Sequence, residues 1–314
     1  MTMRPSALDP MLEGDDYVPA TERRLEESMG LDSMSSLEIL NLLTAQDRVA
    51  VEAVEDAAPE LAELVTIATA CVRSGGAVHY FGAGTSGRLA VLDAAELLPT
   101  YNLKPGVVVA HMAGGPAALV KSVENVEDSV DEGRAAAGDL GPNDLAIGLA
   151  ASGNTPYVGG ALTAARELGA RTALISSNSR ASLAPLADTV VLLETGAEVV
   201  TGSTRLKAGT AEKLALNGFS TALMIALGRT WSNLMVSVVA SNEKLRRRTV
   251  RILMQAAELT EAQSQSRLAD ADGDLKVAIV AALAGVDAAS ARISLLENSD
   301  SVRDALAALA TVSS

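Results

Sequence analysis

Cysteine, histidine and aromatic residues are scarce in this chain of 314 residues. The single cysteine, Cys71, excludes an internal disulfide, and with the two histidines, His79 and His111, it does not make a convincing zinc site. Aromatic residues make up 2% of the chain and hydrophobic residues 48%, so alanine, leucine and valine must fill the interior. We therefore expect a large aliphatic core, without a disulfide or a metal.

Basic residues are outnumbered as well, with 25 basic against 39 acidic side chains and a net charge of −14. Such an acidic chain is a poor partner for nucleic acid or for an anionic membrane surface. The N-terminus lacks the basic segment and apolar core of a signal peptide, so we expect a cytoplasmic protein. The apolar stretch 214–242 is interrupted by Arg229 and by polar residues, which predicts a pair of buried helices and no membrane span.

The most distinctive motif is the turn Gly82-Ala83-Gly84-Thr85-Ser86-Gly87, which follows an apolar run at 77–81. Its G-x-G-x-x-G spacing is that of a dinucleotide site, but such a site needs an acidic residue at the end of the next strand. The next apolar run, 107–110, is followed by His-Met-Ala-Gly-Gly instead. Backbone amides, the two hydroxyls of the turn and a helix N-terminus capped by Ser86 favour a terminal phosphate.

A second loop of the same kind, Ala151-Ser152-Gly153-Asn154-Thr155-Pro156, follows the apolar run 145–150. Thr155 is the expected N-cap of the next helix and Pro156 its first residue. A plain capping role is the alternative for each Ser or Thr in these loops. Because both loops follow strands and contain glycines that allow close backbone approach, we expect them to converge on one anion.

Short apolar runs alternate with helical patterns through the middle of the chain. The strands are expected at 77–81, 107–110, 145–150, 172–176 and 189–193. The helices between them are expected at 87–98, 117–127, 156–168 and around Pro185. This alternation predicts an α/β fold, a three-layer α/β/α sandwich around a mostly parallel five-stranded sheet.

Helical patterns also flank this domain on both sides. The residues up to about position 20 are expected to be a flexible tail, Ser35 and Glu38 have the spacing of a capping box, and Pro59 suits the first turn of a helix that runs to about position 73. After position 193 the pattern is largely helical, with breaks expected at Gly228, Gly273 and Gly285. The predicted division is an N-terminal tail and helices at 1–55, the α/β domain at 56–230 and a C-terminal helical region at 231–314.

Six motifs follow one another along the sequence. They are GAGTSGR at 82–88 with DAAE at 93–96, AGG at 113–115, VENVED at 123–128, ASGNTPY at 151–157 and GAEVVTGSTRLKAGT at 196–210. Together they resemble the N-acetylmuramic acid 6-phosphate etherases of the sugar isomerase (SIS) superfamily, which are related to the glucokinase regulatory protein. The similarity runs from about position 21 to about position 245, and the last motif is the most specific because so long a match rarely recurs by chance.

The resemblance implies an SIS fold and a reaction: cleavage of the lactyl ether at carbon 3 of the sugar, giving N-acetylglucosamine 6-phosphate and D-lactate, in peptidoglycan recycling. In the family's mechanism the open-chain aldehyde acidifies the proton at carbon 2, lactate leaves by elimination, and water adds at carbon 3. Two carboxyl groups can do this without a metal or cofactor. By motif position they are Glu96, which serves lactate and then water, and Glu127.

The resemblance also implies where the sugar phosphate binds and how the chain assembles. Relatives are homodimers with sites near the subunit contact, so a homodimer is implied here. The family often has arginine at the position of Asn154, where asparagine offers hydrogen bonds but no charge. The residues implied to hold the substrate are Ser86, Ser152 and Thr155, with Thr85, Asn154, Ser203 and Thr204 as further candidates.

Simpler interpretations are open for the two carboxylates. Glu96 could be a solvated helix residue paired with Arg88 or Lys104, which is the usual state of a glutamate. Glu124 and Glu127 are spaced one helical turn apart and could form an acidic helix end, and only the motif favours Glu127 as the catalytic one.

Two other functions share such a site. A non-catalytic sugar-phosphate-binding regulator, like the glucokinase regulatory protein, would keep the site, but that protein resembles two such domains in tandem and this chain has room for one. An aldose-ketose isomerase also removes a proton at carbon 2, but it cleaves no ether, and the presence of both Glu96 and Glu127 favours elimination. His111 follows a strand and is a further candidate near the site.

Overall fold

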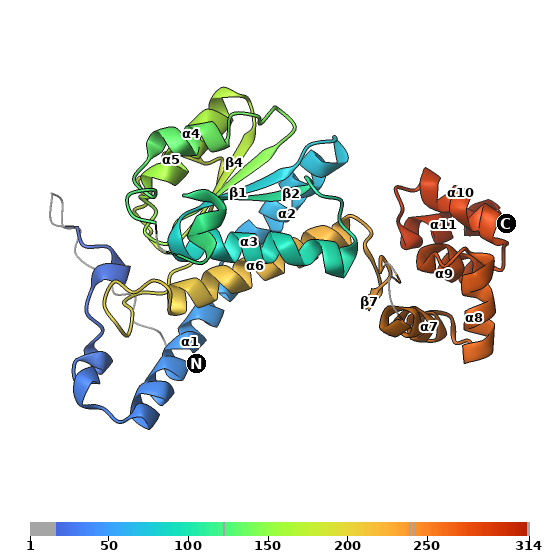
Figure 1. The fold of residues 1–314 in the computed structure, drawn as a ribbon, viewed down its shortest axis with the longest axis horizontal. Coiled ribbons are helices and arrows are strands. Elements are labelled where there is room, and N and C mark those ends of the chain that lie inside the picture. The colour runs from blue at the N-terminus through green and yellow to red at the C-terminus, as the bar shows by residue number, and fades with distance from the viewer. Residues whose placement is uncertain (1–16, 122, 239, 241–242, 313–314) are drawn as a thin grey trace, which may run out of the picture.

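A computed structural model describes residues 17–121, 123–238, 240 and 243–312. At its centre is a sheet of five parallel strands in the order β2-β1-β3-β4-β5, which confirms the predicted α/β architecture (Figure 1). The strands are β1 (Val78–Gly82), β2 (Val108–Met112), β3 (Leu145–Leu149), β4 (Arg171–Ser176) and β5 (Thr189–Leu192). Each lies within two residues of its predicted bounds.

Helices cover both faces of the sheet. Successive strand residues point to opposite sides, and the apolar ones on each side pack against helices. Tyr80 and Ile147 face a core shared with α2, α3 and α6, whereas Phe81 and Ala146 face a second core shared with α4 and α5. These cores are mainly aliphatic, as the composition predicts. The covering helices are α2 (Ala58–Arg73), α3 (Gly84–Tyr101), α4 (Val130–Ala136), α5 (Pro156–Glu167) and α6 (Lys207–Ala226).

The N-terminal elements follow the sequence signals closely. Three short 3-10 helices, Ala20–Glu22, Glu26–Ser28 and Leu31–Ser33, precede α1 (Ser36–Asp56), which packs on α6. The Ser35 hydroxyl accepts the Glu38 amide, and the Glu38 carboxylate accepts the Ser35 amide at 2.8 Å, so the capping box is confirmed. Pro59 lies in the first turn of α2 as predicted. Most of the predicted flexible tail, residues 1–16, lies outside the described residues.

The helix predicted at 117–127 is wrong. A 3-10 helix covers only Gly115–Leu119, turns follow it, and α4 begins at Val130 with Ser129 as its N-cap. The left-handed backbone conformation of Asn125 (φ 63°) lies inside the predicted range, and an α-helix cannot continue through a positive φ.

The buried helix pair predicted at 214–242 is also wrong. One helix, α6, ends at Ala226, and a hairpin of β6 (Thr230–Trp231) and β7 (Leu234–Met235) follows. Gly228 (φ 70°) ends the helical direction, and Ser232 (φ 52°) closes the hairpin. The apolar composition is that of a buried segment, but the turn residues divide it.

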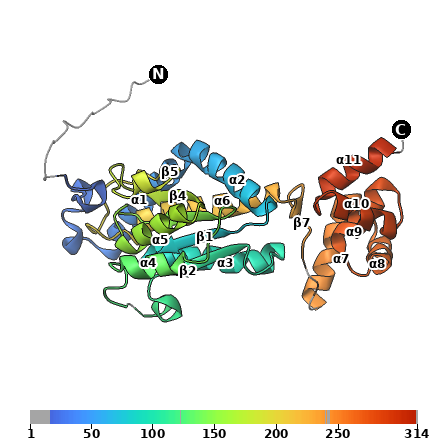
Figure 2. The same cartoon turned by 90° about the horizontal axis from the view of Figure 1, so that it is seen from above.

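The C-terminal helices form a separate unit with its own aliphatic core, which lies beyond the hairpin in Figure 2. Gly273 and Gly285 have positive φ angles at helix breaks, as expected. Among the described helices none alone is long and apolar enough to cross a membrane, although α9 and α10, bent by 108°, pass that test together on length and composition. The helices are α7 (Glu243–Ala257), α8 (Glu261–Asp270), α9 (Leu275–Ala284), α10 (Ala288–Glu297) and α11 (Val302–Val312). The domain boundaries at 55/56 and 230/231 stay a prediction.

Candidate active site

The two hydroxyl-rich loops lie side by side at the carboxyl edge of the sheet. Strands β1 and β3 are hydrogen-bonded neighbours in parallel register, with Gly82 opposite Leu149. Helix α3 begins two residues after the first of these strands, and α5 begins seven residues after the second. The convergence expected from the sequence therefore follows from the strand order, in which β1 and β3 are adjacent.

The glycines of the first loop are required by close packing and by backbone conformation. A Cβ on Gly82 would lie 2.8 Å from the amide nitrogen of Gly87, and one on Gly87 would lie 2.7 Å from the carbonyl oxygen of Gly82. Gly84 has a φ of 54°, which is disfavoured for residues with a side chain. The spacing that resembles a dinucleotide fingerprint thus makes a tight strand-to-helix connection.

The prediction that Ser86 caps this helix is wrong. Ala83 is the N-cap of α3 and no side chain of the described residues caps it, while Ser86 is the third helical residue. The first backbone amides of an α-helix lack partners within the helix, and they carry its positive dipole end. The start of α3 is therefore an open place for an anion, with Thr85 half-buried beside it.

Ser86 is hydrogen-bonded to a buried carboxyl group, Glu212, which the sequence analysis does not identify. Its hydroxyl donates to Oε2 of Glu212, on α6, at 2.7 Å. Glu212 is 3% exposed, and its second oxygen, Oε1, has no hydrogen-bond partner among the described residues. Burial raises the pKa of Glu212 to about 7, and the hydrogen bond from Ser86 opposes this shift. The sequence signal for it is a charged residue among the mainly small and apolar residues on the buried face of α6.

The second loop is more open and is held by different contacts. The side chain of Asn178 donates to the carbonyl oxygen of Ser152 at 2.8 Å, and the Ser152 hydroxyl accepts the amide of Asn154 at 3.3 Å. Asn154 is exposed, and its side-chain oxygen accepts the amide of Ser182 at 3.0 Å. Thr155 occupies the N-cap position of α5, as predicted, but its side chain makes no capping hydrogen bond, which leaves the hydroxyl for other partners.

Glu127 lies at the second loop. Its carbonyl oxygen accepts the amide of Tyr157, the second residue of α5, at 2.9 Å, and its side chain is exposed. The backbone of Glu127 is therefore held against the start of α5, which follows the loop 151–155. Glu124 is exposed as well, and neither residue is on a helix, so the interpretation of the pair as an acidic helix end is wrong.

A third segment, with Ser203 and Thr204, approaches the first loop from α6. A Cβ on Gly209 would lie 3.5 Å from the methyl group of Thr85, so the starts of α3 and α6 are in contact. The start of α6 already holds an anion of the protein itself. Glu198 is fully buried and accepts the amides of Lys207 at 3.2 Å and Ala208 at 3.0 Å.

Glu96 is the predicted residue that the fold does not bring to this edge. It lies on α3 ten residues after Ser86, and at 1.5 Å per residue this is ~15 Å along the helix axis. Its neighbour Leu98 lines a groove with Val108, at the start of β2, which is the opposite edge of the sheet. The side chain of Glu96 is exposed. Arg88, one possible partner, donates to the carbonyl oxygens of Ala118 and Leu119.

His111 is engaged inside the sheet layer. Its Nε2 lies 2.9 Å from Nδ1 of His79, and its ring stacks on Phe81 with 4.6 Å between centroids. Burial lowers the pKa of His111 to about 4, with a smaller contribution from His79 in the same direction. Burial also lowers the pKa of His79, so the neutral form of both rings is favoured and the two rings stack.

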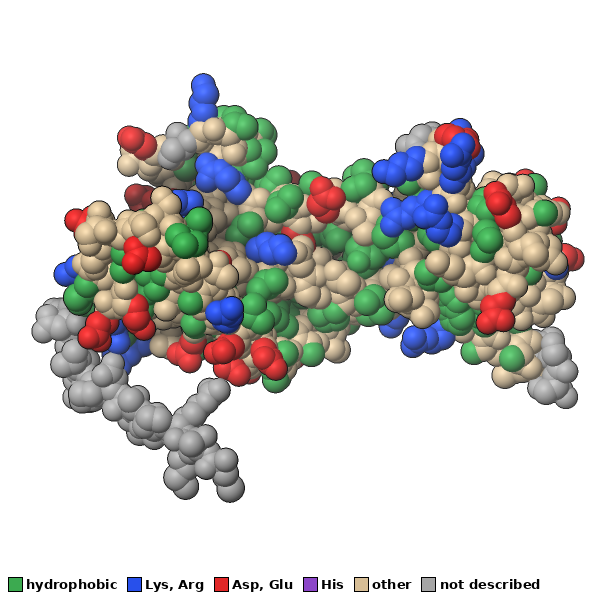
Figure 3. Space-filling model, turned by 90° about the horizontal axis from the view of Figure 1, so that it is seen from below, with side chains coloured by type: hydrophobic (Ala, Val, Ile, Leu, Met, Phe, Trp, Pro, Cys, Tyr) green, Lys and Arg blue, Asp and Glu red, His purple; other side chains and the backbone are tan. Residues whose placement is uncertain are grey.

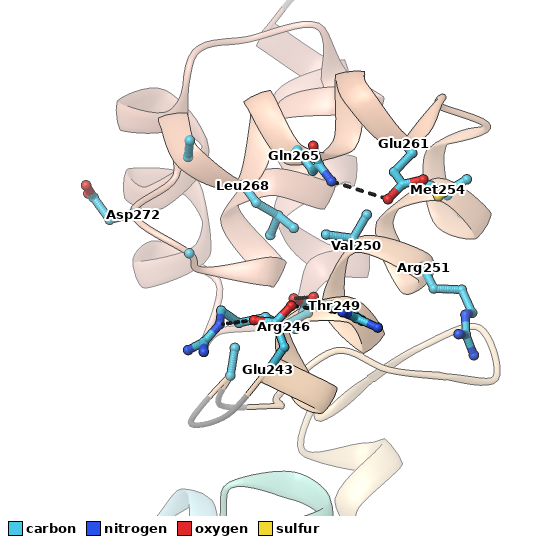
Figure 4. Close-up of a pocket in the computed structure, with 14 residues that line it drawn as sticks. Glu243, Arg246, Thr249, Val250, Arg251, Met254, Glu261, Gln265, Leu268 and Asp272 are labelled. Carbon is cyan, nitrogen blue, oxygen red and sulfur yellow. Dashed lines mark hydrogen bonds and ion pairs between the residues drawn. The ribbon is translucent and has the colours of Figure 1, made fainter.

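A hollow of 920 Å³ lies between α7 and α8, far from these loops (Figure 4). Basic side chains gather on this C-terminal unit in Figure 3. Arg246 pairs with Glu243 at 3.1 Å, and Gln265 donates to Glu261 at 3.3 Å, so the polar lining is largely satisfied internally. Across the described part of the chain, no group of three His, Cys, Asp or Glu side chains could hold a metal ion.

The parallel sheet and its two adjacent hydroxyl loops lie largely in the part of the chain that matches a sugar isomerase (SIS) domain. The family described as the glucokinase regulatory protein N-terminal SIS domain matches residues 60–166. The chain is 51% identical to the N-acetylmuramic acid 6-phosphate etherase of Thermobifida fusca (strain YX), over 84% of this chain and 86% of that one. It is 45% identical to the etherase of Serratia proteamaculans (strain 568), over 91% and 97% of the two chains. The chain belongs to the N-acetylmuramic acid 6-phosphate etherase family.

Among solved structures, the chain is similar to a phosphoheptose isomerase from Francisella tularensis. The TM-score is 0.47 and the identity 18%, over 60% of this chain and 98% of that one.

Proposed function

We propose that the protein cleaves the D-lactyl ether of N-acetylmuramic acid 6-phosphate to N-acetylglucosamine 6-phosphate and D-lactate, as a carbon-oxygen lyase. The observation that carries this proposal is the identity of 51% with an etherase over 84% of the chain. The adjoining starts of α3 and α5, neither with a side-chain cap among the described residues, offer a place for the 6-phosphate. Its role would be peptidoglycan recycling and amino sugar catabolism in the cytoplasm.

The phosphate is proposed to lie at the start of α3, against the backbone amides and Ser86. Ser152, Thr155 and Asn154 would contact it or the sugar from the second loop, and Thr85, Ser203 and Thr204 from the side of α6. Glu127 is proposed to act on the carbon 2 and carbon 3 side of the sugar, and the support for this is that its carbonyl oxygen accepts the amide of Tyr157 at the start of α5. Elimination and rehydration need only proton transfers, so carboxyl groups suffice.

The second carboxylate, Glu96, is proposed to come from a second copy of the chain. At ~15 Å along α3 from Ser86 it is too far from its own phosphate site to reach the same sugar. The same helix, α3, exposes Leu92 and Leu98 by 52% each, next to the half-buried edge strand β2. A homodimer that covers this apolar edge would bring Glu96 of one copy toward the loops of the other.

The first test is release of D-lactate from N-acetylmuramic acid 6-phosphate by the purified protein. We expect Glu96→Gln to abolish release while N-acetylglucosamine 6-phosphate still binds. Glu124→Gln is the matched control for Glu127→Gln, because both residues are exposed on the same segment. No lactate from the wild type, with fructose 6-phosphate bound, would overturn the etherase proposal in favour of a regulator or an isomerase.

Mixing two variants that are each nearly inactive at low substrate concentration tests the shared site. In dimers of Glu96→Gln with Ser86→Ala, one of the two sites regains an intact serine and an intact glutamate if they come from different copies. Random exchange of subunits should then restore about a quarter of wild-type activity. If each copy uses its own Glu96, no activity returns.

A further inference from the structure

The hydrogen bond between Ser86 and Glu212 competes with a hydrogen bond from Ser86 to a bound phosphate. A serine hydroxyl has one proton, and here that proton is donated to Oε2 of Glu212 at 2.7 Å. A phosphate ester accepts hydrogen bonds and cannot donate one when it is a dianion. As long as Glu212 is ionised and takes the proton of Ser86, this hydroxyl has nothing to donate to the ligand.

The ionised carboxylate would also compete with the ligand through its charge. Ser86 is the third residue of α3, so the carboxylate that it contacts lies close to the positive end of that helix. A bound phosphate would be a second anion at the same helix end. Within a buried site the repulsion between two anions is weakly screened.

Nothing on the packed elements neutralises Glu212 in place of a proton. Its Oε1 is buried without a hydrogen-bond partner among the described residues, and Ser86 is the only side chain bonded to Oε2 there. The charged groups on α1, α3 and the start of α6 are bonded to other partners. They are Asp47 on α1, bonded by Thr210; Lys207 on α6, bonded to Gln46; Glu198, bonded by the start of α6; and Asp93 on α3, bonded by Tyr80, Asn217 and Ser220.

We propose that Glu212 is a positioning residue that takes up one proton from solvent when a phosphate ester binds at the start of α3. The protonated Glu212 then donates to Ser86, and Ser86 donates its own proton to a phosphate oxygen. The relay runs from the carboxyl hydrogen through the hydroxyl to the ligand, and no covalent bond other than O–H changes. This proposal rests on the proposed function only for the place of the phosphate.

Burial already brings Glu212 close to this state, since it raises its pKa to about 7 in the empty site. Below that pH the free protein holds the proton, and binding needs none from solvent. Above it, binding has to be accompanied by proton uptake, so the affinity for phosphate falls by up to tenfold for each pH unit.

The variant Glu212→Gln distinguishes the ionisation of Glu212 from all other effects of pH on phosphate binding. The amide keeps the volume and the donor to Ser86 but cannot ionise. We expect inorganic phosphate and N-acetylglucosamine 6-phosphate to bind the variant and the wild type within about threefold at pH 6, and the wild type to bind about 30-fold more weakly at pH 8.5. The second ionisation of phosphate affects both proteins equally and cancels in this ratio. Asp93→Asn, at the other carboxylate buried between α3 and α6, is the matched control and should leave the ratio unchanged.

Titration calorimetry of the wild type in two buffers of different ionisation enthalpy measures the proton directly. We expect uptake of close to one proton per site at pH 8.5, and close to none in Glu212→Gln. Equal pH dependence in the two proteins, no uptake by the wild type, or failure of phosphate to bind at any pH would overturn the proposal. Because neither assay uses the ether, proton uptake without lactate release would refute only the proposed reaction, and lactate release without uptake only the role of Glu212.

Discussion

The two loops at the carboxyl edge of the sheet have nearly the same sequence design but different surroundings. Each follows a buried strand, contains glycine and hydroxyl residues, and opens a helix. In the first loop, Ser86 is 8% exposed and is hydrogen-bonded to an ionisable group, Glu212. Behind the second loop Ser152 is half-exposed, and its carbonyl oxygen is bonded by the amide side chain of Asn178.

This difference divides two tasks between loops of one type. The first loop provides the open helix start, and the group beneath it can change charge. The second loop provides half-exposed hydroxyls and places Glu127, and the amide that holds it cannot titrate. The first loop should therefore determine how tightly phosphate binds and at which pH, and the second how the sugar is placed.

The largest expected effect is on stability, from glycines that look equivalent in the two loops. A Cβ on Gly153 would lie 2.3 Å from that of Ala181, and φ there is 69°, whereas Gly84 has φ 54° and open space. Gly153→Ala should therefore lower the free energy of unfolding by about 4 kcal/mol, and Gly84→Ala by about 1 kcal/mol. Urea denaturation of both variants measures this, and equal losses would show that backbone strain alone determines the cost.

The next effect is on the pH dependence of stability. The pKa of Glu212 is raised to about 7, so the folded state holds this proton more tightly than the unfolded chain. Stability is then fully present at pH 4 and is lost as pH rises through 7, where Glu212→Gln should exceed the wild type by about 3 kcal/mol. Thermal unfolding of the ligand-free proteins from pH 4 to 8.5 tests the sign. A gap that does not widen with pH would mean that Glu212 is not protonated preferentially in the fold.

A smaller effect is expected in binding. Ser86→Ala should weaken binding of N-acetylglucosamine 6-phosphate by about 2 kcal/mol, because a donor to a charged group is lost, and Ser152→Ala by about 1 kcal/mol from its more open position. Calorimetry below pH 7 compares the two variants while Glu212 is protonated. The reverse order would assign the main phosphate contacts to the second loop.

The smallest effect concerns Asn154. Its side-chain oxygen accepts the amide of Ser182 at 3.0 Å at an exposed position, where water can replace it. Asn154→Ala should therefore cost about 0.5 kcal/mol of stability. Urea denaturation measures this, and a loss several times larger would indicate that this contact fixes the whole second loop.

Much of the fold could be predicted from local patterns, because strands buried on both faces and helix caps leave strong signals. All five strands, the capping box at Ser35 and the helix start at Pro156 agree with the structure. The two failures, at 117–127 and 214–242, came from left-handed residues such as Asn125 and Ser232. An apolar or acidic pattern does not show that a non-glycine residue will take such a conformation.

The candidate site was predicted less completely. The motifs indicated the two loops, and the roles of Glu96 and Glu127 stay a prediction, whereas the N-cap position expected for Ser86 belongs to Ala83. The contact with Glu212 joins residues 126 positions apart, and no periodicity reports it. The separation of Glu96 from the loops was also hidden, since it depends on the direction in which α3 runs back along the sheet.

The sequence by itself determined the class of fold, the family and the glycine turn, because these depend on the order of buried strands and on residues close together in the chain. Only the tertiary structure decided which elements face one another: α6 against the start of α3, β1 beside β3, and Glu96 at the far end of its helix. The physical reason is that burial and charge at a site come from neighbours distant in sequence. Glu212 differs from other glutamates of the chain because the packing of α6 against the start of α3 buries its carboxyl group beside Ser86.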